Sequence, residues 1–270
     1  MVINTNIAAL DAANDLDQSN NALNASLARL STGSQLVTAA DNPAGLAESI
    51  SLNAQIGQTN AANDNIGNAV SFLQTQDGYL QQIGTALDQM ASLAIEAQDG
   101  TISSSQAQDY QKEYAALGSY INATASQTFN GVSLFSNAVL SVTTDGSGGY
   151  YLMNGVDLGQ TSSYYTAANA DISTSTGATT ALSDVTLAIS QLGTDRAGVG
   201  AAEERLQYTG QALTVLATNL TAANSQISDV DVATESTKFA KEQILVQSGT
   251  AMLSQANQDP QNVLKLIENI

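Results

Sequence analysis

Residues 229–270 read DVDVATESTKFAKEQILVQSGTAMLSQANQDPQNVLKLIENI, and this C-terminal stretch decides the fold. Its apolar side chains recur at the spacing of one face of an α-helix, and amide side chains crowd the rest of the surface. Helices at a chain end usually fray unless another surface covers them. The apolar positions that we expect to be covered in an assembly interface are Val232, Phe239, Val246, Leu253, Val263, Leu264, Leu266 and Ile267.

The first 33 residues carry a helix of the same kind. Asn and Asp lower its intrinsic propensity, so it needs packing to form, and Gly33 is suited to a C-terminal cap. We expect the two terminal helices to lie side by side, with apolar seams that are exposed in the monomer and covered by other subunits. The N-terminal positions of this predicted interface are Ile3, Ile7, Leu10, Leu16, Leu23, Leu27 and Leu30.

Two long heptad patterns separate the terminal helices. Residues 44–97 and 179–224 predict antiparallel helices of similar length, because Pro is almost absent and apolar residues recur every three or four positions. Residues 139–153 have the alternation and the Gly-rich turn of a β-hairpin. The predicted fold is therefore mainly α, a long antiparallel coiled-coil rod with paired terminal helices and a small β-hairpin insert. The predicted parts are 1–33 with 231–270 as terminal helices, 34–43 and 225–230 as linkers, 44–131 with 178–224 as the rod, and 132–177 as the hairpin with a solvent-facing excursion.

Composition excludes several classes of function. The chain has no His and no Cys, which removes thiol and histidine catalysis and most zinc sites, so we expect no enzyme activity, cofactor or metal. A net charge of -18 opposes binding to nucleic acid or to anionic lipid. No apolar run is long enough to span a membrane, and the N-terminus lacks the features of a secretory signal. By these rules alone the protein would be cytoplasmic.

Only seven Lys and Arg residues occur in the chain, so each cation stands out. Arg29, Arg196 and Arg205 lie near acidic residues or on predicted helix faces. Local ion pairs explain such arginines, and so does a role in setting the register between subunits. The sequence leaves both interpretations open.

Several motifs at the two ends resemble those of bacterial flagellins. They occur in the same order, and the resemblance covers roughly the first 130 and the last 90 residues. The matching stretches are Ile3-Asn-Thr-Asn6, Arg29-Leu-Ser-Thr-Gly33, Ala40-Asp-Asn-Pro-Ala-Gly-Leu46, Gly200-Ala-Ala-Glu-Glu-Arg205, residues 227–235, residues 243–257 and Pro260-Gln-Asn-Val-Leu264.

The resemblance implies a structural subunit that polymerises with itself into the filament of the bacterial flagellum for motility. It also implies export through the flagellar type III apparatus with an uncleaved N-terminus, so the expected location becomes secreted, in the flagellum. The implied partners are an export chaperone that grips the C-terminal helix, the filament cap and the hook-junction proteins.

The resemblance has one departure that concerns recognition by vertebrate toll-like receptors. Recognised flagellins carry Arg in a segment of the long N-terminal helix, whereas this chain has Gln89 and Ala91 there. We predict weak receptor activation, and a full response of reporter cells to the purified monomer would contradict this. The positions of the degenerate segment are Gln89, Met90, Ala91, Leu93 and Ile95.

Three alternatives stay open at this point. A hook–filament junction protein shares the terminal motifs, but it would not form long filaments alone. A cytoplasmic signalling coiled coil would place its hairpin tip in the middle of the rod and would lack the β insert. An enzyme would have to rely on carboxylates alone.

Overall fold

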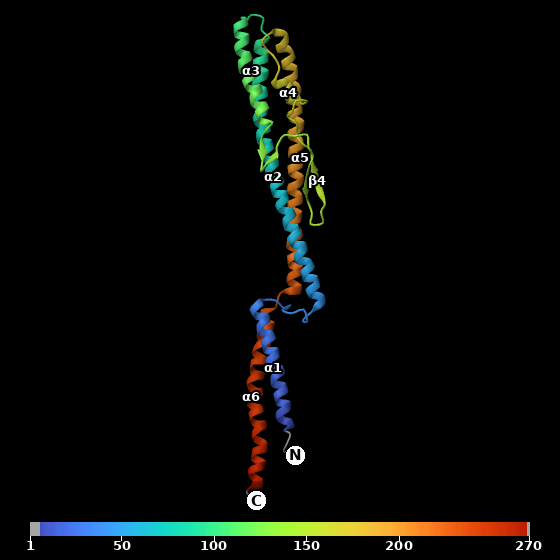
Figure 1. Ribbon diagram of the computed structural model, residues 1–270, viewed down its shortest axis with the longest axis vertical. Coiled ribbons are helices and arrows are strands. Elements are labelled where there is room, and N and C mark those ends of the chain that lie inside the picture. The colour runs from blue at the N-terminus through green and yellow to red at the C-terminus, as the bar shows by residue number, and fades with distance from the viewer. Residues whose placement is uncertain (1–5, 269–270) are drawn as a thin grey trace. The chain divides into compact units, whose positions relative to one another are not determined.

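The structure, a computed structural model, describes the backbone of residues 6–268 and the side chains of residues 6–258. It is mainly α, as the sequence predicts, and it has two small antiparallel strand pairs where one hairpin was predicted (Figure 1). The elements in chain order are α1 (Ile7–Thr32), α2 (Pro43–Ala97), α3 (Ser104–Thr124), β1 (Thr128–Phe129), β2 (Val132–Ser133), β3 (Leu140–Thr143), β4 (Tyr150–Met153), α4 (Ser163–Ala168), α5 (Ser175–Ser228) and α6 (Val232–Glu268).

The chain divides into two compact units. The terminal unit comprises Met1–Ala54 and Asn219–Ile270, and the central unit comprises Gln55–Thr218. The long helices α2 and α5 contribute residues to both units. The buried apolar core that the structure describes lies entirely between Ala62 and Leu213, so it belongs to the central unit.

Local signals in the sequence set the helix boundaries. Gly33 ends α1 in a left-handed conformation, with φ of 72°, and its N–H donates to the Arg29 carbonyl. Asn42 starts α2 by accepting a hydrogen bond from the Gly45 N–H at 3.0 Å. Ser103 and Gln106 form a capping box at the start of α3. Each of these boundaries lies within one residue of a cap or breaker visible in the sequence.

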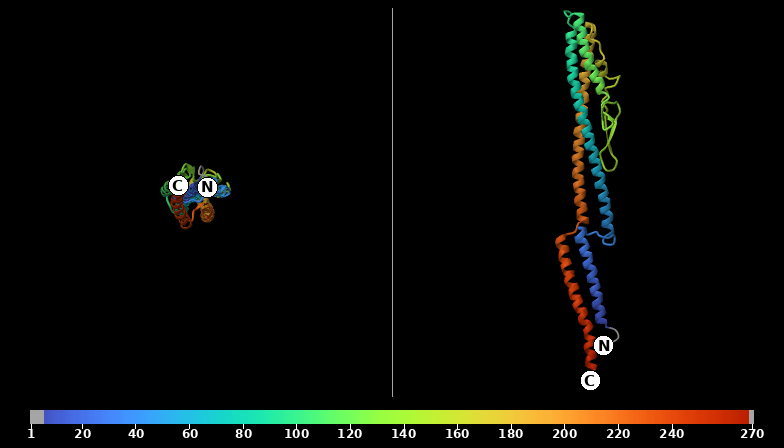
Figure 2. Two further views of the ribbon diagram at one scale, coloured as in Figure 1. Left: turned by 90° about the horizontal axis from the view of Figure 1, so that it is seen from below. Right: turned by 60° about the vertical axis from the view of Figure 1, so that its left-hand side comes forward.

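In the central unit, α2 and α5 lie side by side and antiparallel (Figures 1 and 2). The Gln98 amide donates to the Ala178 carbonyl at 3.4 Å near one end, and the Gln74 amide donates to Glu203 at 2.8 Å further along. Between them the buried positions of the seam are mostly apolar, as the heptads predict, and the Arg196–Asp77 ion pair also joins the two helices. The fully buried α2 side chains of this seam are Leu80, Ile83, Leu87, Met90 and Ala94.

The predicted hairpin is β3 and β4, paired antiparallel from Leu140 opposite Met153 to Thr143 opposite Tyr150. Asp145 organises its turn, because its carboxylate accepts from the backbone N–H groups of Ser147 and Gly149, both at 2.7 Å. A second, shorter pair, β1 with β2, turns at Asn130 and Gly131, which both have positive φ. Helix α3 stops at Thr124 and β1 begins at Thr128, so this strand pair occupies the end of the range 44–131 that the sequence assigned to the rod.

The segment after the hairpin differs from the expected solvent-facing excursion. It contains the short helix α4, and Val156, Leu158, Tyr164 and Ile172 within it are buried. Buried polar contacts hold it, since the Tyr114 hydroxyl donates to the Ala167 carbonyl at 2.7 Å. Its high Ser, Thr and Tyr content suggested exposure to solvent, but the segment covers the helical core.

The second linker is shorter than expected. Helix α5 runs to Ser228, into the 225–230 range assigned to a linker, because no Gly or Pro interrupts it there. The two linkers pair through their backbones: the Gln35 N–H donates to the Ser228 carbonyl at 2.8 Å, and the Val230 N–H donates to the Gly33 carbonyl at 3.0 Å. We call this paired segment, residues 33–35 with 228–230, the linker clip.

Candidate functional site

The terminal helices α1 and α6 lie side by side and antiparallel (Figures 1 and 2). At one end the Asn6 amide donates to the Ala256 carbonyl at 2.7 Å, and at the other the Ser26 hydroxyl donates to the Glu235 carbonyl at 3.4 Å. Residues that are at least half-buried recur at steps of three and four on both helices, the pattern of a coiled-coil seam. They are Ala9, Ala12, Leu16, Ser19, Leu23, Ser26 and Leu30 on α1, and Glu235, Phe239, Glu242, Val246, Gly249, Leu253 and Ala256 on α6.

This seam is thin. A Cβ atom at Gly249 would lie 3.2 Å from Leu16, so the two helices approach closely there. Among the described side chains of α1 and α6, Ser26 and Glu235 are buried, and every apolar side chain is at least partly exposed. The pair therefore covers its apolar stripe only in part.

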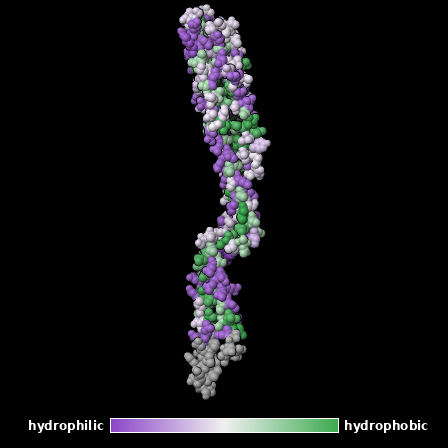
Figure 3. All heavy atoms as spheres, viewed as in Figure 1, coloured by the Kyte–Doolittle hydropathy of each residue, from purple (hydrophilic) through white to green (hydrophobic). Residues whose placement is uncertain are grey.

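A second set of apolar side chains on these helices points away from the seam. Leu245 and Met252 lie one heptad apart on the flank of α6, beside the seam positions Val246 and Leu253, and Ile244 directly precedes Leu245. Hydrophobic residues are visible between hydrophilic ones on the surface of this pair in Figure 3. The large exposed apolar residues are Ile7, Leu10 and Leu27 on α1, and Val232, Ile244, Leu245 and Met252 on α6.

Residues 3–139 match the family model of the bacterial flagellin N-terminal helical region, and residues 182–267 match that of the C-terminal helical region. The chain belongs to the bacterial flagellin family. It is 33% identical to the flagellar filament 33 kDa core protein of Treponema phagedenis, over 99% of this chain and 100% of the relative. It is also 33% identical to a flagellin of Bacillus subtilis, with the same coverage of both chains. The crystal structure of Bacillus cereus flagellin resembles it with a TM-score of 0.50 and 26% identity, over 60% of this chain and 94% of that chain.

Flagellins are structural proteins, so this chain is a structural subunit of the flagellar filament and not an enzyme. The comparisons give no support to the junction-protein or signalling alternatives. Within residues 6–268, no helix is both long enough and apolar enough to cross a membrane.

The predicted interface residues of this flagellin separate into two groups. Leu16, Leu23, Leu30, Phe239, Val246 and Leu253 are half-buried in the seam within the subunit, whereas Ile7, Leu10, Leu27 and Val232 are exposed. Ile3 lies outside the described residues, and Val263, Leu264, Leu266 and Ile267 lie outside the described side chains. Met252 is not among the predicted interface residues, although its heptad position beside Leu253 signals that it flanks the seam.

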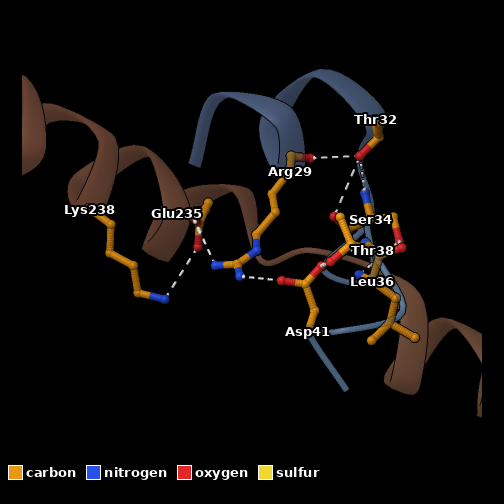
Figure 4. A network of polar contacts seen from close by, with 8 residues as sticks. All are labelled: Arg29, Thr32, Ser34, Leu36, Thr38, Asp41, Glu235 and Lys238. Carbon is orange, nitrogen blue, oxygen red and sulfur yellow. Dashed lines mark hydrogen bonds and ion pairs between the residues drawn. The ribbon is translucent and has the colours of Figure 1, made fainter. Parts of the chain in front are cut away.

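Charged groups join the helix pair to the first linker (Figure 4). Arg29 lies 3.1 Å from the Asp41 carboxylate and 3.7 Å from the Glu235 carboxylate, and Lys238 lies 3.2 Å from Glu235. Burial alone would raise the pKa of Glu235, but its contacts with Ser26 and Lys238 and the charges of Lys238 and Arg29 outweigh burial and lower that pKa. Glu235 is therefore ionised at neutral pH and links α1 to α6 beside the linker clip.

The other two predicted register-setting arginines also contact groups of their own chain. Arg196 grips the Asp77 carboxylate with two bonds of 2.8 and 3.1 Å, which joins α5 to α2. The Arg205 guanidinium lies 4.2 Å from the centre of the Tyr151 ring, against the hairpin. These are local roles, and a role of the three arginines between subunits stays a prediction.

The predicted receptor-recognition segment lies on α2. Met90 and Leu93 are buried in the core, and Ala91 is half-buried. Gln89 and Ile95 are exposed. A partner that approaches this segment would therefore meet an amide and an isoleucine side chain, and no Arg from these five positions.

Proposed function

We propose that this flagellin polymerises by burying the exposed apolar side chains of α1 and α6 against the same helices of neighbouring copies. The observation that carries the proposal is the thin seam: the described part of the helix pair contains no buried apolar side chain. Full burial of one Leu, Ile or Met side chain contributes about 1.5–3 kcal/mol. Several such side chains on each helix supply a driving force that the isolated subunit leaves unused.

An open polymer requires contacts between unlike surfaces. We infer that α1 of one copy meets α6 of the next, and such a contact joins unlike surfaces because the exposed apolar residues of the two helices differ in identity and spacing. Contacts of this heterologous kind generate rings when the rotation closes and helical filaments when it does not. A filament requires the second outcome.

The expected partners other than flagellin itself follow from the family resemblance. We infer that an export chaperone covers α6 before assembly, that the chain leaves the cell through the type III apparatus, and that it then meets the cap and the hook-junction proteins. The absence of Cys supports export through a narrow conduit, because no disulfide has to be broken or formed on the way.

The proposed surface is tested by replacing one exposed isoleucine on α6, with an equally exposed isoleucine on α2 as the control. Ile244→Gln on α6 should leave the stability of the monomer within about 0.5 kcal/mol, because the side chain is 62% exposed. It should raise the critical concentration for polymerisation about tenfold or more, since a polar amide would have to be buried between copies. Sedimentation of the polymer measures this effect.

Ile50→Gln is the matched control, because Ile50 on α2 is 61% exposed and lies outside the proposed surface. We expect Ile50→Gln to polymerise at the native critical concentration. An equal loss of polymer in both variants, or no loss at Ile244→Gln, would refute the assignment of the surface to α6.

A further inference from the structure

Met252 is in an unusual position for a methionine of this chain. The chain has four methionines, and the structure describes the surroundings of three. Met90 is fully buried and Met153 is 4% exposed, both in the core of the central unit, whereas Met252 on α6 is 64% exposed. Its thioether therefore stands on the helix surface that the proposed function places between subunits.

We propose that Met252 is an oxidation site that controls assembly: a peroxide converts its thioether to a sulfoxide in the free subunit, and the oxidised subunit no longer enters the polymer. In this step the sulfur attacks one peroxide oxygen and the O–O bond breaks. The sulfur is oxidised to the sulfoxide, and hydrogen peroxide is reduced to water. The inference rests on the proposed function, because it requires the flank of α6 to be covered by a second copy.

The selectivity of oxidation for Met252 follows from the exposure of its side chain. A peroxide reaches Met252 directly, but it reaches Met90 or Met153 only after the core opens, which is a rare event for buried helix and strand residues. The chain also has no Cys to compete for the oxidant. Met252 is therefore the preferred target among the methionines that the structure describes.

The effect on assembly follows from the change in polarity. A sulfoxide is polar, whereas a thioether packs as a flexible apolar group. In the monomer the new oxygen is solvated by water, so oxidation costs α6 no buried hydrogen bond. Between subunits it would be buried on the same apolar flank of α6 that carries Leu245, and an apolar surface offers no hydrogen-bond donor to the sulfoxide oxygen.

The experiment treats native monomer with hydrogen peroxide and follows each methionine by peptide mass spectrometry. We expect Met252 to gain one oxygen at least about tenfold faster than Met90 or Met153, because the buried pair requires opening. Treated monomer should then need about tenfold more protein to polymerise. In filaments assembled before treatment, the oxidation rate of Met252 should fall toward that of Met90.

Two variants separate the effect of Met252 from general damage. Met252→Leu should show the same critical concentration with and without peroxide, each measured against its own untreated sample. Met252→Gln should polymerise poorly without any oxidant, while its circular dichroism matches that of the native monomer.

The outcomes distinguish this inference from the proposed function. Polymerisation of Met252-oxidised subunits at the native critical concentration would overturn the inference and leave the proposed function standing. Equal oxidation rates at Met252, Met90 and Met153 would also overturn it. If Ile244→Gln also polymerised normally, the proposed surface itself would be refuted.

Discussion

A chain reduced to residues 43–228 is expected to stay folded and to form no sedimentable polymer under conditions in which the full chain polymerises completely. It should stay folded because the described apolar core lies between Ala62 and Leu213, inside the retained residues. It should not polymerise because it lacks α1 and α6, whose exposed apolar side chains carry the proposed contacts. Sedimentation and electron microscopy measure the polymer, and circular dichroism measures the fold.

The thermal midpoint of the reduced chain serves as its control. A midpoint close to that of the central unit in the full chain would show that loss of polymer is not loss of folding. Filaments formed by the reduced chain would mean that the central units alone carry the contacts between subunits, and the proposed function would fail.

Gly118→Ala is expected to destabilise the central unit by about 1–3 kcal/mol, the range seen when a packed core is overfilled. Gly118 on α3 is buried against α4, and a Cβ atom there would collide with the Ala168 carbonyl oxygen and lie 2.9 Å from its carbon. The colliding atoms belong to the backbone, so α4 has to move as a whole. That movement would also strain the bonds from Tyr114 to Ala167 and, at 2.7 Å, from Tyr164 to Asp195.

Gly67→Ala is the matched control on α2. Nothing lies within 4 Å of the position that its Cβ would take, and Gly in a helix interior is about 0.5–1 kcal/mol less favourable than Ala. Urea unfolding followed by near-ultraviolet dichroism of tyrosine should therefore show opposite signs for the two variants. Equal effects at Gly118 and Gly67 would mean that the close approach of α3 and α4 does not constrain the fold.

Local signals account for most of the fold that the sequence predicted. The start of α2 at Asn42-Pro43 and the end of α1 at Gly33 are determined by the residues at those positions. The heptad pattern of residues 44–97 predicted the helical seam in which Leu80 and Leu87 are buried, because a long amphipathic stripe has few alternatives to such a seam. The sequence predicted the structure correctly where a single capping residue sets a helix boundary or a heptad repeat sets a helical seam.

Contacts between distant segments account for what the sequence did not reveal. Burial of Tyr164 and Ile172 depends on the close approach of α4 to Gly118, which no local pattern marks. The terminal helices pose the same problem. Their sequence shows one broad apolar stripe, but whether Leu253 packs within the subunit and Met252 points away from it depends on where the partner helix α1 lies.

The linker clip has a consequence for the order in which the terminal helices close. Ser34 and Asp229 form a β-bridge, so the last turn of α1 and the first turn of α6 are tethered to each other within a few residues. Tethering keeps the local concentration of one helix near the other high at this end and lower toward Asn6 and Ala256. We therefore expect the helix pair to close from the tether outward and, on heating, to open from the Asn6 and Ala256 end inward.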